Sequence, residues 1–214
     1  MRDEIHFVKA YGQPREVGQQ IGRALAGVIP RILADQGIPD RFCTDAHRRM
    51  LDRMAENIQR IVPEKWEEME GIAEGAGLPF DHILMLNCLV ERWREGCSAV
   101  AFVDSPGGPI VGQQHDIGKD KAYYDVLHVI DIPGRAQVMT ERWPGTVWGG
   151  YGVNELGLAC AGAFVQTNEW REDGIPVNMF GMLVLERAGS VEEAVSYTHL
   201  RAHETSLHLV CRLL

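Results

Sequence analysis

The clearest candidate for chemistry is the bond between Gly96 and Cys97, in the run Glu95-Gly96-Cys97-Ser98. Gly96 has no Cβ, so it can adopt a strained conformation and lets a sulfur atom approach its carbonyl. Thiolates are good nucleophiles near neutral pH. An N-to-S acyl shift at this bond, followed by hydrolysis, would leave Cys97 with a free α-amine. Such an amine has an unperturbed pKa of about 7.7–8.0, which suits a general base.

A buried core thiol is the competing interpretation of Cys97. Cys43, Cys88 and Cys160 are expected to be small apolar core residues of that kind. The five cysteines contain no CxxC pair and no framework spacing. We therefore expect a reduced, cytoplasmic protein.

The period of the apolar residues changes at Cys97. Before it, a short strand is predicted at 6–10, and helical spacing predicts helices over 15–35, 45–61, 64–74 and 80–91. Gly18 and Gly22 lie inside the first of these helices. Because glycine there costs about 1 kcal/mol against alanine, we expect another backbone to pack closely against it.

After Cys97 the pattern is that of strands joined by glycine-rich turns. Strands are predicted around 100–102 and 110–111, and over 126–132, 136–140, 146–151 and 156–165. A helix is predicted over 177–188, and Ser190 is a predicted N-cap of another. Helices packed on antiparallel sheets indicate an α+β fold.

The run 95–98, with Gly112-Gln113-Gln114-His115-Asp116 downstream, resembles the self-cleavage region of the acyl-CoA:6-aminopenicillanic acid acyltransferase family. The glycine-rich stretches 14–22 and 70–77 resemble that family's helical pro-region. The resemblance implies an N-terminal-nucleophile (Ntn) hydrolase with an αββα sandwich, incomplete in this chain. Residues 1–96 would be the mainly helical pro-region (α chain), and residues 97–194 the first part of the catalytic domain (β chain).

The resemblance also implies roles for individual residues. Cys97 would be the nucleophile, and Asp116 would orient its amine or thiol. Ser98, Gln114 and Asn154 would be supporting residues. No metal and no cofactor is required by this chemistry.

Other polar and aromatic residues near these positions have competing interpretations. His115 alternates with Asp116, so the two are expected on opposite faces, and a packing or surface role for His115 is favoured. Trp143, Trp148 and Tyr151 would either line an acyl pocket or pack within the strands.

The last part of the chain is expected to be foreign to the protein. Residues 196–205 and 209–214 match, in one reading frame, two constant parts of a translated sequencing-library adaptor. We therefore expect residues 195–214 to be a non-native tail and the gene to be cut off near Ala194. The histidines and the cysteine of this tail would otherwise suggest a zinc site. An oxyanion-hole Asn and an Arg of the family lie farther along, so we expect this fragment to be impaired.

The formal net charge of -9, without a basic stripe, disfavours nucleic acid and anionic membranes as partners. We expect a self-processing cysteine Ntn hydrolase that hydrolyses a linear amide or transfers an acyl group through a Cys97 thioester. Its partners would be a small-molecule amide or acyl donor, and the two cleaved chains would stay associated. A choloylglycine or penicillin-V-acylase type amidase is one alternative, disfavoured by the long helical segment before Cys97 and by Gln113 where those enzymes have Arg. The other is a non-catalytic, unprocessed binding domain.

Overall fold

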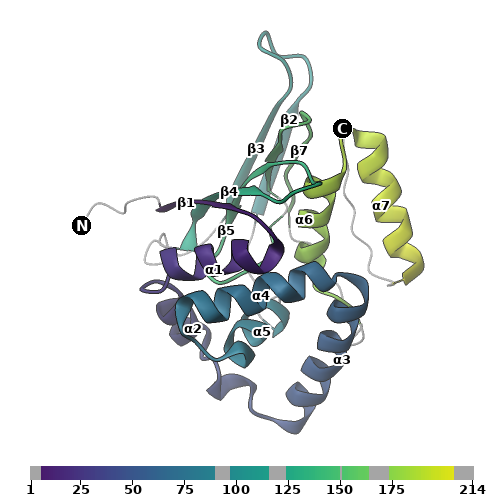
Figure 1. Ribbon diagram of the computed structural model, residues 1–214. Coiled ribbons are helices and arrows are strands. Elements are labelled where there is room, and N and C mark those ends of the chain that lie inside the picture. Colours follow the sequence, from purple (N-terminus) through teal and green to yellow (C-terminus); the bar gives the residue numbers. More distant parts are fainter. Residues whose placement is uncertain (1–5, 90–96, 116–123, 150, 164–173, 205–214) are drawn as a thin grey trace.

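The computed structural model describes residues 6–89, 97–115, 124–149, 151–163 and 174–204 (Figure 1). The fold is mixed α and β, as predicted. A five-stranded sheet lies above helices α1 to α5 in the view of Figure 1, and a two-stranded ribbon projects away from these helices. None of the described helices is long and apolar enough to cross a membrane.

The larger sheet joins both sides of the predicted cleavage bond. Its strand order is β1-β4-β5-β6-β7, with β1 parallel to β4 and the other neighbours antiparallel. The strands are β1 (His6–Tyr11), β4 (Val126–Asp131), β5 (Val138–Arg142), β6 (Gly152–Asn154) and β7 (Ala159–Cys160). The strand predicted at 6–10 is thus confirmed, but its partner comes 120 residues later. The sheet therefore does not divide at Cys97.

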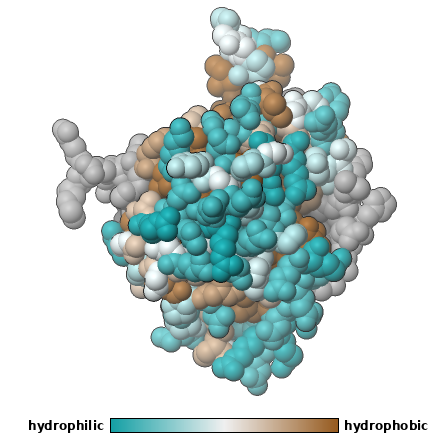
Figure 2. Space-filling model, viewed as in Figure 1, coloured by the Kyte–Doolittle hydropathy of each residue, from teal (hydrophilic) through white to brown (hydrophobic). Residues whose placement is uncertain are grey.

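The ribbon consists of β2 (Cys97–Phe102) and β3 (Ile110–His115), paired antiparallel. A turn that contains Pro106, Gly107 and Gly108 joins them, in line with the glycine-rich turns expected between strands, and Gly108 N–H donates to the Ser105 carbonyl at 3.0 Å. Val100, Phe102, Val103 and Ile110 are each at least half exposed on it. In Figure 2 the projecting ribbon carries hydrophobic (brown) surface, above a largely hydrophilic body.

The helices follow the predicted pattern with one break. They are α1 (Pro14–Ala24), α2 (Ile29–Gln36), the 3-10 turn η1 (Asp40–Phe42), α3 (Asp45–Ile61), α4 (Pro63–Ala76), α5 (Phe80–Leu89), α6 (Val177–Arg187) and α7 (Val191–Glu204). The single helix predicted over 15–35 is wrong, because the chain turns at 25–28 and restarts with Pro30 in the first turn of α2. Proline has no N–H for a continuing helix. Ser190 accepts from Glu193 N–H at 3.2 Å, which confirms the predicted cap of α7.

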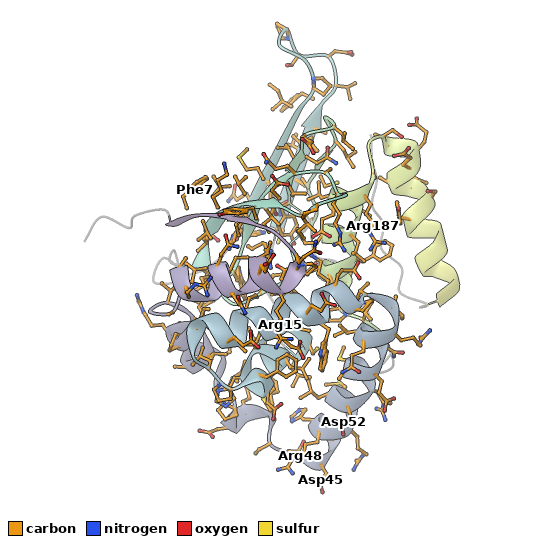
Figure 3. The ribbon with its side chains drawn as sticks, in the orientation of Figure 1. Phe7, Arg15, Asp45, Arg48, Asp52 and Arg187 are labelled. Atoms are coloured by element: carbon orange, nitrogen blue, oxygen red, sulfur yellow. The ribbon has the colours of Figure 1, made fainter. Side chains whose placement is uncertain are left out.

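Helices α1 and α4 pack backbone against backbone, as the glycines predicted. A Cβ on Gly18 would lie 2.1 Å from the Glu68 carbonyl oxygen, and one on Gly22 would lie 2.3 Å from that of Ile72. Gly71 and Gly75 of α4 face α1 in the same way. Around this crossing Arg15, labelled in Figure 3, donates to Glu70 at 2.9 Å and pairs with Glu74. Since no side chain fits between the helices, their axes are held at one separation.

The strand predicted over 146–151 is wrong. Residues 143–149 form a buried irregular segment that is bonded to α5. The Asn87 amide donates to the Gly145 carbonyl at 3.0 Å and its oxygen accepts from Val147 N–H at 2.8 Å. These bonds replace strand pairing for the backbone here. Of the strand predicted over 156–165, the structure describes residues 156–163, and within these β7 covers only 159–160.

Candidate functional site

Cys97 is the first residue of β2, and its free thiol is partly exposed. Gly96 and Asp116 lie outside the described residues. The register of the ribbon places His115 directly across from Cys97. Directly opposed residues of an antiparallel pair share one face, with their Cβ atoms about 5 Å apart. The side chain across from the predicted nucleophile is therefore the imidazole of His115.

The predicted supporting residues of the ribbon face the other way. Ser98 pairs with Gln114, and both are exposed. Because side chains alternate along a strand, Ser98 and Gln114 lie on the face opposite to Cys97 and His115. The structure thus brings Cys97 together with His115 rather than with Gln114.

His115 sits in a polar cluster at the base of the ribbon. Its Nδ1 lies 3.8 Å from Oε2 of Glu141 on β5, and its ring meets the Tyr151 ring edge-on at 4.9 Å between centroids. Asp125, just before β4, completes the cluster. One donor atom each of His115, Asp125 and Glu141 lies within 4.8 Å of the others. These three residues, termed the acid–imidazole cluster below, are the group in the described part of the chain that could hold a metal ion.

The two carboxyl groups of this cluster are electrostatically perturbed. Burial raises the pKa of Glu141 to about 8, and the charge of Asp125 and a hydrogen bond to it add to the shift, while Arg142 opposes it. Burial also raises the pKa of Asp125, against the opposing charge of His115 and the bond to Glu141. Oδ1 of Asp125 and Oε1 of Glu141 are buried without a hydrogen-bond partner. At neutral pH the pair therefore retains about one proton.

Asn154 is buried, and its side-chain amide forms hydrogen bonds with four backbone groups. Its amide nitrogen donates to the carbonyls of Leu185 and Ala188 at 2.9 and 2.7 Å, and its oxygen accepts from Leu156 and Leu158 N–H at 3.1 and 2.9 Å. These bonds fix the β6–β7 turn to the end of α6. They support a structural function for this residue.

Some of the aromatic residues and cysteines considered in the sequence lie in the core, and others do not. Trp143 and Trp148 are buried and pack together with Tyr124, so in this structure they belong to the core. Tyr151 is partly exposed against His115. Cys88 is buried, as predicted, whereas Cys160 is only partly buried and Cys43 is exposed. The core prediction for Cys43 is wrong, since it lies in the turn that precedes α3.

A buried ion network was not predicted from the sequence. Lys65 and Glu68 of α4, Arg142 of β5 and Glu186 of α6 are each at most 1% exposed. Lys65 Nζ lies 3.0 Å from Glu68 and also pairs with Glu186, while Arg142 lies 2.8 Å from Glu68. Burial raises the pKa of Glu68, but Arg142 and Lys65 outweigh burial and hold the pKa below its usual value.

The network continues to the surface and crosses the predicted cleavage bond. Arg135 pairs with Glu186 at 2.6 Å and with Glu64 at 3.4 Å, and Arg187, labelled in Figure 3, also pairs with Glu64. Glu64, Lys65 and Glu68 of α4 come before Cys97, and apart from the Lys65–Glu68 pair their partners come after it. The sequence held one sign that Arg142 would be buried. Arg142 follows Val138 and Thr140 at intervals of two residues, so it lies on the same inward face of β5.

Comparisons with known proteins identify the family of this chain. A family model, "Acyl-coenzyme A:6-aminopenicillanic acid acyl-transferase", matches residues 103–211, just over half of the chain. The chain belongs to this family. It is 25% identical over 195 residues to the acyl-coenzyme A:6-aminopenicillanic-acid-acyltransferase 40 kDa form of Emericella nidulans, which covers 86% of this chain and 54% of the relative. The chain thus spans about half the length of the curated relative it matches.

Proposed function

We propose that this chain carries the nucleophile of a self-processing cysteine Ntn acyltransferase or amidohydrolase. The observation that carries the proposal is the position of Cys97. It opens β2 with a free, partly exposed thiol, directly after the segment that contains β1 and helices α1 to α5, in a member of an acyltransferase family.

The first reaction is cleavage of the chain. The Cys97 thiolate adds to the Gly96 carbonyl carbon, the C–N bond breaks, and the nitrogen takes up a proton to become the α-amine of Cys97. Water then hydrolyses the Gly96 thioester, which yields the Gly96 carboxylate and the free thiol. Residues 1–96 stay bound, because β1 is paired with β4 and the buried ion network joins α4 to β5 and α6.

The second reaction uses the new N-terminus. The thiol attacks an acyl donor, and the α-amine takes its proton and returns it to the leaving group. An amine acceptor or water then resolves the acyl-Cys97 thioester. The relative's name contains an acyl-coenzyme A and an aminopenicillanic acid, so we propose a thioester or amide as donor and a small amine as acceptor. Asp116, outside the described residues, is the proposed orienting carboxylate.

Cleavage is tested by treating the purified chain with hydroxylamine, which attacks thioesters. The chain contains no Asn-Gly pair, the other bond that hydroxylamine cleaves readily. We expect slow release of residues 1–96 as a hydroxamate, detected by intact mass spectrometry. Cys97→Ala should abolish the release, and Cys43→Ala, at an exposed thiol, should leave it unchanged. A wild-type chain that stays whole would favour the non-catalytic binding domain.

A further inference from the structure

The acid–imidazole cluster joins three separate elements. His115 ends β3 of the ribbon, Asp125 directly precedes β4, and Glu141 lies on β5 of the larger sheet. Their donor atoms converge to within 4.8 Å of one another, with His115 Nδ1 at 3.8 Å from Glu141 Oε2. All three side chains are partly buried. A ligand bound among them would therefore connect the ribbon to the sheet.

Asp125 and Glu141 are hydrogen-bonded to each other, but each carboxyl group keeps one buried oxygen without a hydrogen-bond partner. Oδ1 of Asp125 and Oε1 of Glu141 are buried and accept no hydrogen bond. Two carboxyl groups this close together repel each other when both are ionised, unless they share a proton or a cation lies between them. Arg142 is the next residue along β5, but its hydrogen bonds go to Glu68 and to the Thr146 carbonyl. The cluster thus has acceptor atoms in place for a cation that no described side chain supplies by hydrogen bonding.

The chemical nature of the three ligand groups indicates which class of metal ion would bind. One imidazole nitrogen and two carboxylates suit Zn²⁺ and similar divalent transition metals, whereas Mg²⁺ and Ca²⁺ prefer oxygen ligands alone. The donors of a tetrahedral zinc ion lie about 3.4 Å apart. The donor atoms here lie at most 4.8 Å apart, so small side-chain rotations would bring them to that value.

We propose that His115, Asp125 and Glu141 bind one divalent transition-metal ion of the Zn²⁺ class. The ion fastens the end of β3 to the start of β4 and the end of β5. Because His115 is the direct cross-strand partner of Cys97, the ion also fixes the start of β2 relative to the larger sheet. Its function is structural and does not depend on the proposed cleavage reaction.

Metal uptake is measured on the full chain after removal of metal with a chelator. We expect one equivalent of Zn²⁺ to bind by calorimetry, and one equivalent of Co²⁺ to produce a visible absorption band that Zn²⁺ displaces and Mg²⁺ does not. Glu141→Gln and Asp125→Asn should each weaken binding at least tenfold. Asp131→Asn, an exposed carboxylate at the end of β4, should bind like the wild type. Circular dichroism shows whether each variant is folded.

The histidines at 199 and 203 require their own control, since they are spaced four residues apart in the sequence. His199→Gln with His203→Gln should leave the cobalt band unchanged. Loss of the band in this double variant, but not in Glu141→Gln, would move the site to the tail and overturn the proposal. An absence of any one-to-one uptake would overturn it as well, and would mean that the two carboxyls share only a proton. Neither result depends on whether the chain cleaves at Gly96.

Discussion

Arg142 of β5 and Glu68 of α4 form a buried ion pair, 2.8 Å apart, between segments that lie on either side of the Gly96–Cys97 bond. Both side chains are at most 1% exposed. Removing two charges from water is costly, and the cost is recovered only while both partners remain. The pair therefore makes the attachment of the helical segment to the sheet sensitive to a single substitution.

We expect Arg142→Met to lower the free energy of unfolding by about 3–5 kcal/mol, because it leaves the Glu68 carboxylate buried with one cation fewer. Chemical denaturation with urea measures the change. Arg187→Met is the matched control, since Arg187 is 39% exposed in its pair with Glu64; it should cost at most about 1 kcal/mol. Equal losses in the two variants would show that the burial of Arg142 contributes nothing special.

At the α1–α4 crossing, helix propensity and packing predict opposite changes in stability for a substitution of Gly18. Helix propensity alone favours Gly18→Ala by about 1 kcal/mol. Packing opposes it, because the new Cβ would lie 2.1 Å from the Glu68 carbonyl oxygen and 2.9 Å from Ile72 N. We expect packing to dominate, with a net loss of about 3 kcal/mol by thermal or urea denaturation.

Gly27→Ala is the control for that substitution. No heavy atom lies within 4 Å of the position its Cβ would take, so its effect should stay below about 1 kcal/mol and can be stabilising. A stable Gly18→Ala protein would contradict the close approach of the two backbones.

The buried His128 leads us to predict that its contribution to stability is lost in mild acid. Burial lowers its pKa to about 3, with Arg142 adding to the shift and the Val126 carbonyl and Glu68 opposing it. The unfolded chain takes up this proton below about pH 6.5 and the folded chain does not. The contribution of His128 to the free energy of unfolding therefore falls as the pH drops from about 6.5 toward 3, by up to about 1.4 kcal/mol per pH unit.

Urea denaturation at several values between pH 6.5 and 5 measures this slope. The raised pKa of Glu141 adds a slope of opposite sign in this range, so the test compares the slope of each variant with that of the wild type. His128→Leu should show a shallower slope than the wild type, whatever its absolute stability. His82→Leu, at a partly exposed position of α5, should keep the wild-type slope. An unchanged slope in His128→Leu would contradict a buried, neutral imidazole.

Local features of this protein could be predicted from the sequence because their causes are local. Helix α3 covers residues 45–61 as its apolar spacing predicted, and Ser190 caps α7 through its own hydroxyl. The glycines of α1 indicated a close backbone neighbour, although the sequence did not say that α4 would be that neighbour. Likewise the change of period at Cys97 indicated the start of the strand that opens with the predicted nucleophile.

The sequence by itself thus predicted most helices, most strands and the candidate nucleophile, since each rests on residues near one another in the chain, and short motifs along the chain predicted the family. Tertiary structure decided which distant groups meet. The pairing of β1 with β4, the position of His115 across from Cys97, and the meeting of Arg142 with Glu68 all depend on register and packing between distant segments. Charges are ordinarily read as surface residues, so a buried network shows itself only when the packing that removes water is known.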